Sequence, residues 1–259
     1  MTKYLVKVYS WESPHLCFSE AEFLRQDRVI IKKEGYQNEI GVIEVVDVKT
    51  KEETLSLIAR KASKKDIEIF ENNEEKKDEI LRTCKEEIRR LNLEMKLVDA
   101  RISLDGSNIV IAFTAEERVD FRDLVRSLSK IFKRSVRMQQ IGSRDEARNL
   151  GGCGVCGRSL CCLRFSGSLP SISIDMARVQ QIAHRGSDRI SGICGRLMCC
   201  LSYEASQYQE LMVGMPEIHS SVKTSQGKGD VVEIMPLSGE VKVKLANGKY
   251  EIFKKKDIN

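Results

Sequence analysis

The sequence predicts an α+β fold: a central two-layer α/β sandwich, a cysteine-rich metal module, and small β-barrel-like units from the N- and C-terminal segments. Three observations support this prediction. Short β-rich runs gather near both ends of the 259-residue chain, helix and strand signals alternate in the middle, and seven of the nine cysteines lie between positions 153 and 200. We therefore expect an N-terminal β unit (1–60), an α/β sandwich (61–148), a cysteine-rich cluster module (149–214) and a C-terminal β unit (215–259).

The composition excludes several classes of protein. With 41% hydrophobic and 31% charged residues, the chain is typical of a globular protein that buries a sizeable core. Residues 1–8 lack the apolar run of a signal peptide, and no stretch approaches the roughly 18 apolar residues of a membrane span. We therefore expect a cytoplasmic protein without membrane insertion, whose clustered cysteines serve metal or redox chemistry rather than disulfides.

The N-terminal segment reads as strands. Alternating and β-branched residues predict strands at 3–8, 28–33 and 40–48, interrupted by a short helical signal at 19–24. Cys17 lies in a loop-like stretch and is expected to be a core residue.

The next segment predicts the sandwich. One long helix is expected over 63–91, with Cys84 on its apolar stripe as a core residue. Strands at 95–104 and 109–115 are joined by a turn that contains Asp105-Gly106, and an amphipathic helix begins at the candidate N-cap Asp120. A strand at 135–141 and a helical turn at 143–149 complete this order, which predicts a sheet covered by helices on one face.

The C-terminal segment returns to short strands, expected at 221–224, 230–235, 240–245 and 249–253. Ser238-Gly239 and Asn247-Gly248 supply turns between them. Strands this short and evenly spaced predict a small barrel-like unit.

Six cysteines form a repeated heptad, C-G-R-x-[LM]-C-C, with an offset of 38 residues. A duplicated set of thiols is more than packing requires, and it is what a metal or cluster site needs. A glycine follows the first cysteine of each copy and permits a tight bend, and the next residue, Arg158 or Arg196, places a cation beside the site. The proposed ligands are Cys156, Cys161, Cys162, Cys194, Cys199 and Cys200, with Cys153 as an auxiliary.

Spacing alone leaves the metal open. Adjacent side chains diverge by roughly 100° on a helix and 180° on a strand, so both members of the pair Cys161-Cys162 are not expected to bind one metal. Cys153-x-x-Cys156 has zinc-knuckle spacing, and on spacing a 4Fe–4S cluster and zinc stand level. A thioredoxin-type site is disfavoured because Leu150-Gly151-Gly152, not a strand, precedes it. His184 is not assigned as a ligand, and no catalytic motif indicates an enzyme.

Positive charge gathers around these cysteines. The chain carries a net charge of +5, yet residues 118–200 hold fifteen Lys/Arg and six Asp/Glu, a net +9. All six basic residues between 156 and 200 are arginines, which favour planar acceptors such as phosphate and carboxylate. This excess fits either RNA contact or pairing with acidic faces, and Arg158, Arg164 and Arg196 are the candidate contacts for nucleic acid or a partner.

These motifs resemble the YaaT/RicT-like stage-zero sporulation protein family, which has the polymerase-suppressor C-terminal domain. The resemblance covers nearly the whole chain. The motifs that carry it are Arg144-Asp145-Glu146-Ala147, Leu150-Gly151-Gly152, the two heptads, Ser191-Gly192 and Leu201-Ser202-Tyr203-Glu204.

The resemblance implies a cytoplasmic, non-catalytic regulatory subunit that carries 4Fe–4S clusters on the heptad cysteines. It also implies assembly with small helical YlbF-like and YmcA-like proteins and action with RNase Y in mRNA processing. Two positions depart from the family pattern. Cys153 stands where the family has isoleucine and could complete a site within this chain, and Asp175 stands where the family has lysine.

Overall fold

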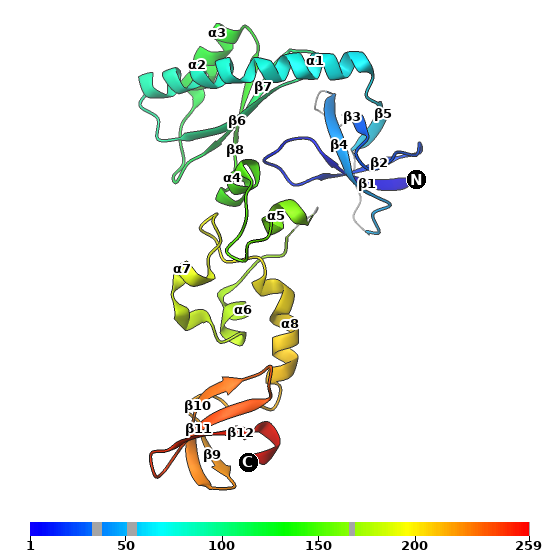
Figure 1. Cartoon of the computed structure of the whole chain (residues 1–259). Helices are drawn as coiled ribbons and strands as arrows, with labels where there is room; N and C mark the ends of the chain where they lie inside the picture. The colour runs from blue at the N-terminus through cyan, green and yellow to red at the C-terminus, as the bar shows by residue number, and fades with distance from the viewer. Residues whose placement is uncertain (33–37, 51–55, 166–168, 259) are drawn as a thin grey trace. The chain divides into compact units, whose positions relative to one another are not determined.

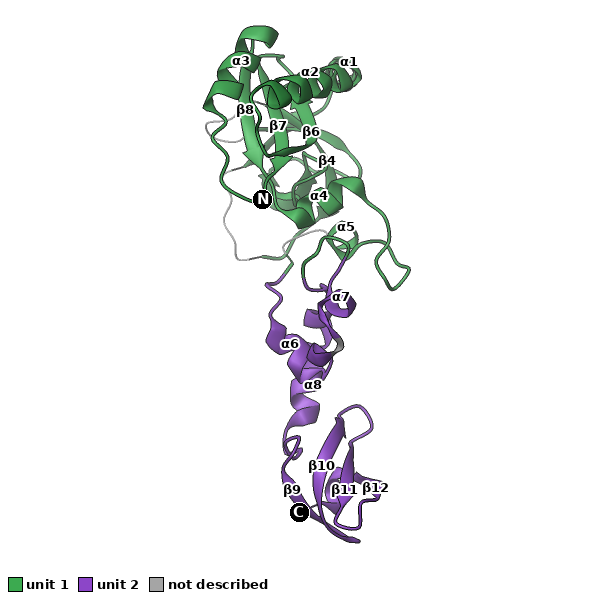
Figure 2. Ribbon diagram, turned by 90° about the vertical axis from the view of Figure 1, so that its left-hand side faces the viewer, with its two compact units in different colours: residues 1–169, 193–196 green, residues 170–192, 197–259 purple. Residues whose placement is uncertain are grey.

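The computed structural model describes residues 1–32, 38–50, 56–165 and 169–258 (Figure 1). The chain divides into two compact units: unit 1 comprises residues 1–169 and 193–196, and unit 2 comprises residues 170–192 and 197–259 (Figure 2). The predicted α+β class is confirmed. Over the described ranges, no helix combines the length and the apolar character needed to cross a bilayer.

Five strands at the N-terminus close a barrel in the order β1-β2-β5-β3-β4, which confirms the predicted N-terminal β unit. They are β1 (Thr2–Lys7), β2 (His15–Ser19), β3 (Arg28–Lys32), β4 (Glu39–Val46) and β5 (Leu57–Lys61). Side chains alternate along β1, so that Tyr4 and Val6 face the core while their neighbours are half-buried. Cys17 was expected in a loop but lies on β2; it is fully buried, as expected. The helical signal at 19–24 was wrong, because β2 extends to Ser19 and irregular backbone follows.

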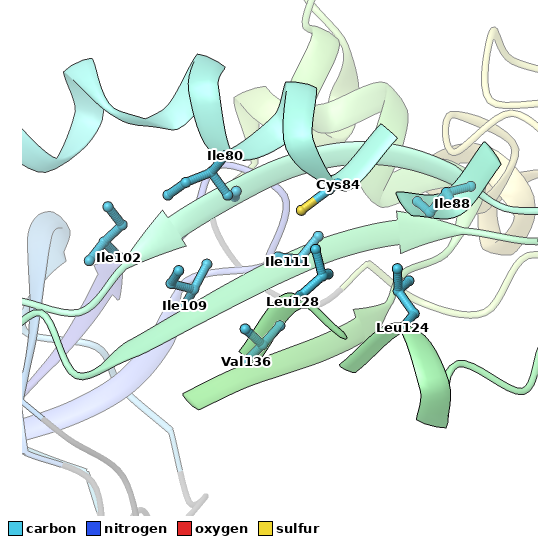
Figure 3. Packing of buried hydrophobic residues seen from close by; sticks show 10 residues of the cluster. Ile80, Cys84, Ile88, Ile102, Ile109, Ile111, Leu124, Leu128 and Val136 are labelled. Atoms are coloured by element: carbon cyan, nitrogen blue, oxygen red, sulfur yellow. The ribbon is translucent and has the colours of Figure 1, made fainter. Parts of the chain in front are cut away.

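The sandwich has a three-stranded sheet in the order β6-β7-β8, with helices on one face. Its elements are α1 (Lys64–Glu75), α2 (Lys77–Arg90), β6 (Lys96–Ile102), β7 (Asn108–Thr114), α3 (Arg122–Phe132) and β8 (Ser135–Gln140). Strands β6 and β7 are antiparallel, whereas β7 and β8 are parallel. Figure 3 shows Ile80 and Cys84 of α2 pointing toward the strands, where they pack with Leu128 of α3.

Two helix predictions need correction. The expected helix over 63–91 is two helices, because the N–H of Lys76 bonds to the carbonyl of Glu74 and breaks the ladder. Helix α1 buries no described residue, so of these two helices it is α2 that packs its apolar stripe, including Ile80 and Cys84, into the core. Helix α3 begins after Phe121, and the carboxylate of Asp120 accepts instead from the backbone N–H of Arg122 at 3.1 Å.

The second face of the sheet is covered by the segment that follows β1. The rings of Tyr9 and Trp11 stack with their centroids 4.8 Å apart, and they pack against Val110 and Ala112 of β7. This contact makes the barrel and the sandwich parts of one unit.

The remaining elements frame the cysteines and end in a sheet. They are α4 (Ser143–Leu150), α5 (Cys161–Arg164), α6 (Ile174–Val179), η1 (Ala183–Arg185), α7 (Ser187–Ile190), α8 (Leu201–Met212), β9 (Ser221–Thr224), β10 (Gly227–Met235), β11 (Glu240–Leu245), β12 (Tyr250–Lys254) and η2 (Lys255–Asp257). The four C-terminal strands form a sheet in the order β12-β11-β10-β9, not the expected barrel-like unit, because two edge strands stay unpaired with each other. Helix α8 was not predicted.

Candidate metal centre

The two cysteine heptads fold into the same backbone conformation. An isolated bridge joins Cys153 to Ser159 in the first loop, and its equivalent 38 residues later joins Ser191 to Leu197. The loop glycines have left-handed φ values of +73° at Gly157 and +72° at Gly195. The sequence repeat is therefore also a structural repeat.

Hydrogen bonds at the base of each loop repeat as well. The N–H of Leu160 donates to the carbonyl of Gly152 at 3.2 Å, and the N–H of Met198 donates to that of Ile190 at 2.9 Å. A helix follows each loop, α5 after the first and α8 after the second. Both vicinal cysteine pairs thus lie where a loop becomes a helix.

The seven cysteines differ in exposure and in the unit to which they belong. Cys153, Cys156 and Cys200 are exposed, and Cys161, Cys162, Cys194 and Cys199 are half-buried. Five of them, including Cys194, belong to unit 1, whereas Cys199 and Cys200 belong to unit 2. The five in unit 1 are free thiols.

Cys162 lies in an electrostatically distinct environment. Burial raises the pKa of its thiol, the guanidinium of Arg148 opposes this rise, the thiol of Cys194 adds to it, and Arg144 lowers it again. The effect of Cys194 on this pKa places the first cysteine of the second heptad near the last cysteine of the first. Cys194 also belongs to unit 1, the unit that holds the whole first loop.

Arg148 anchors the first loop to the body of unit 1. Its side chain is only 6% exposed. Nε donates to the carbonyl of Cys162 at 3.2 Å, and Nη1 donates to the carbonyl of Trp11 at 3.2 Å and to Asp145 Oδ1 at 3.1 Å. One buried cation thus joins helix α4, the segment after β1 and the cysteine loop.

The three candidate contact arginines lie on the surface. Arg158, Arg164 and Arg196 are exposed, and none forms an ion pair with a carboxylate of the described residues. The Cζ atom of Arg164 lies 5.8 Å from the centroid of the Phe165 ring. His184, which was not assigned as a ligand, is also exposed.

The donors fit a thiophilic metal by type but do not form a complete site. Thiolates are the usual ligands of zinc and of iron–sulfur clusters. Within the residues that the structure describes, no three His, Cys, Asp or Glu side chains gather closely enough to hold a metal ion. The metal assignment therefore stays a prediction.

Two features of the centre were missed in the sequence. The half-buried Arg144 and the buried Arg148 are four residues apart, so they lie on one side of α4 directly before the first loop. Their i, i+4 spacing could have predicted from the sequence that both arginines lie on the same side of this helix. The bond from Arg148 to Trp11 could not be predicted, because 137 residues separate the two.

Replacing Gly195 or Gly157 with alanine is expected to destabilise the corresponding loop by about 1–2 kcal/mol, because a Cβ at φ near +72° is strained. No atom lies within 4 Å of the added Cβ, so backbone strain alone should cause the loss. Hydrogen exchange of the two loops measures it. Gly154 lacks a positive φ, and Gly154→Ala serves as the control; equal protection in all three variants would contradict the prediction.

Barrel, sandwich and duplicated loops together define an α+β protein with a repeated cysteine centre. Residues 56–141 match the family model described as the PSP1 C-terminal conserved region, and residues 171–215 match the third domain of PSP1-like proteins. The chain is 39% identical over 193 residues to the stage 0 sporulation protein YaaT of Bacillus subtilis, covering 74% of this chain and 70% of that protein.

The chain belongs to the YaaT-like family of PSP1 proteins, which confirms the resemblance carried by its motifs. An uncharacterized protein of Schizosaccharomyces pombe is 28% identical over 81 residues, which span 31% of this chain and 11% of that protein. No solved structure matches the chain.

Proposed function

We propose that this protein is a non-catalytic, cytoplasmic regulatory subunit that carries an iron–sulfur cluster and modulates RNase Y-dependent mRNA processing. The observation that carries the proposal is the duplicated loop, in which sequence, bridge and glycine conformation all repeat after 38 residues. Membership of a family that includes a sporulation protein supports a regulatory role. The YlbF-like and YmcA-like helical proteins are the proposed partners, with RNA as a further one.

The heptad cysteines would hold the cluster, with Cys153 as an auxiliary ligand. A 4Fe–4S cluster bound there would supply oxygen-sensitive redox or structural chemistry. The contribution of the chain itself is positional. Arg148 holds the backbone at Cys162, and the guanidinium groups of Arg148 and Arg144 would offset negative charge near that thiol.

The test is anaerobic purification followed by iron and sulfide analysis. Cys161→Ser and Cys199→Ser are each expected to lose the bound iron, and the absorbance near ~400 nm with it, while the sandwich stays folded. Cys153→Ser is the matched control: its counterpart in the second loop is naturally Ser191, so we expect this variant to keep most of its iron. Iron retained in all three variants would contradict the proposed ligands.

A second candidate is a zinc-stabilised nucleic-acid-binding module. The C-x-x-C segment from Cys153 to Cys156 is followed by the left-handed Gly157, and a bridge between Cys153 and Ser159 closes the loop, which favours a knuckle-like zinc loop. Purification of a colourless protein with stoichiometric zinc would support it. RNA affinity should then fall steeply with salt concentration.

A further inference from the structure

The tips of the two cysteine loops expose aliphatic side chains at equivalent positions of the repeat. Val155 and Ile193 are 38 residues apart, and each directly precedes a heptad's first cysteine. Their exposed fractions are 77% and 57%. A structural repeat that keeps a large aliphatic residue exposed at both tips indicates a contact made outside the chain.

Two further apolar residues that flank the first loop in the chain are also exposed. Leu150 at the end of α4 is 75% exposed, and Phe165 after α5 is 47% exposed. These two residues and both tips belong to unit 1. We call Leu150, Val155, Phe165 and Ile193 the apolar rim of the thiol centre.

Cations accompany the rim. Arg158 and Arg196 follow the loop glycines, and Arg164 precedes Phe165. All three are exposed, and no described carboxylate pairs with them. A surface of exposed aliphatic groups among unpaired guanidinium groups is complementary to a protein face that presents apolar side chains and carboxylates.

We propose that the apolar rim is the docking surface for a different protein, whose contact face is apolar and acidic. This inference rests on the proposed function, because it assigns a partner to the same thiol centre. Docking there would cover the exposed thiols of Cys153 and Cys156.

Two other occupants fit the rim less well. A second copy that used the same face would bring arginine opposite arginine, and like charges oppose a self-complementary contact. RNA-binding surfaces use aromatic rings on which bases stack, and three of the four rim residues are aliphatic. An acidic protein face satisfies both the aliphatic groups and the cations.

The experiment places a benzophenone amino acid at position 155 or 193 of the full chain in its native cells. The same substitution at Leu24, which is 75% exposed in unit 1 outside the rim, is the control. We expect positions 155 and 193, but not 24, to crosslink to the same protein through a segment rich in carboxylates and apolar residues. That protein is then purified and titrated with the chain.

Binding should weaken at least ~tenfold in Val155→Ser/Ile193→Ser and in Arg158→Glu/Arg196→Glu. Leu24→Ser and Arg25→Glu, at exposed positions of the same unit, should bind like the wild type. Crosslinks to the chain itself, to RNA, equally from position 24, or to nothing would overturn the proposal, as would unchanged affinity in both double variants.

Iron analysis separates this inference from the proposed function. A chain without iron that still binds through the rim would reject the cluster and keep the docking surface. If the chain carries iron but its affinity for the partner protein is unchanged in the rim variants, the docking surface is rejected and the cluster is kept.

Discussion

Replacement of Arg148 by methionine is expected to lower the free energy of unfolding of unit 1 by about 2–4 kcal/mol, because buried polar groups that lose their partner cost about 1–3 kcal/mol each. The carbonyls of Trp11 and Cys162 would each lose a donor that now lies 3.2 Å away. Asp145 is 37% exposed and can return to water, so its contribution should be small. Methionine fills a similar volume, and a cavity is therefore not the main cause.

Urea unfolding followed by tryptophan fluorescence measures this loss. Trp11 is the chain's single tryptophan, it is 1% exposed, and its own carbonyl accepts the bond, so the signal reports on the altered region. Arg148→Lys keeps the positive charge but lacks the several N–H donors of the guanidinium group. We expect this variant to recover less than half of the free energy of unfolding that Arg148→Met loses. Arg126→Met, on a side chain that is 75% exposed, is the control and should change stability little.

The same substitution should loosen the first cysteine loop. With the Nε bond to Cys162 removed, hydrogen exchange at 153–162 is expected to rise, while exchange at the barrel strand β4 should change less. Equal increases in both segments would show that Arg148 supports the whole unit and has no particular role at the loop.

Strong periodic patterns made most of the fold predictable. The amphipathic stripe that contains Leu124 and Leu128 gave helix α3, and the Asp105-Gly106 turn gave the β6–β7 hairpin, with Gly106 at φ +72°. Strand β5 was missed because it is short and its residues are mostly exposed, so it lacks an alternating pattern. The break at Lys76 was missed because the charged residues around it favour helix on both sides.

Only those features of the site that depend on residues close together in the sequence could be predicted. The 38-residue repeat in the sequence predicted two equivalent loops, and their matching bridges confirm them. The proximity of Cys162 to Cys194 and the bonds made by Arg148 depend on tertiary packing across 32 and 137 residues, which no local pattern encodes. Exposure of Val155 and Ile193 likewise required the structure, since apolar residues in such loops usually turn inward.

Substitution of Glu39 by glutamine is expected to remove a pH dependence of stability that centres on the barrel. The carboxylate begins β4 and accepts a hydrogen bond from Tyr9 Oη at 3.1 Å. Burial raises the pKa of Glu39 from 4.5 to about 7, whereas the hydrogen bond from Tyr9 and the charge of Arg101 partly offset this rise. The buried glutamate therefore favours its protonated form in the folded state.

The direction of the effect follows from proton binding. Between about pH 4.5 and 7 the folded state retains a proton that the unfolded state has released, so the free energy of unfolding falls as pH rises through this interval. The loss from pH 5 to pH 8 should be about 1–3 kcal/mol, since one pKa unit corresponds to about 1.4 kcal/mol. Glutamine stays neutral and its amide oxygen can still accept from Tyr9, so Glu39→Gln should be more stable than the wild type at pH 8.

Urea unfolding of both proteins at pH 5, 6, 7 and 8 provides the measurement. The difference between wild type and Glu39→Gln isolates this carboxylate, because every other ionisable group is common to the two proteins. Glu71→Gln, at a side chain that is 62% exposed, is the control and should follow the wild-type profile. Parallel profiles for wild type and Glu39→Gln would show that Glu39 is already ionised in the folded barrel at pH 5.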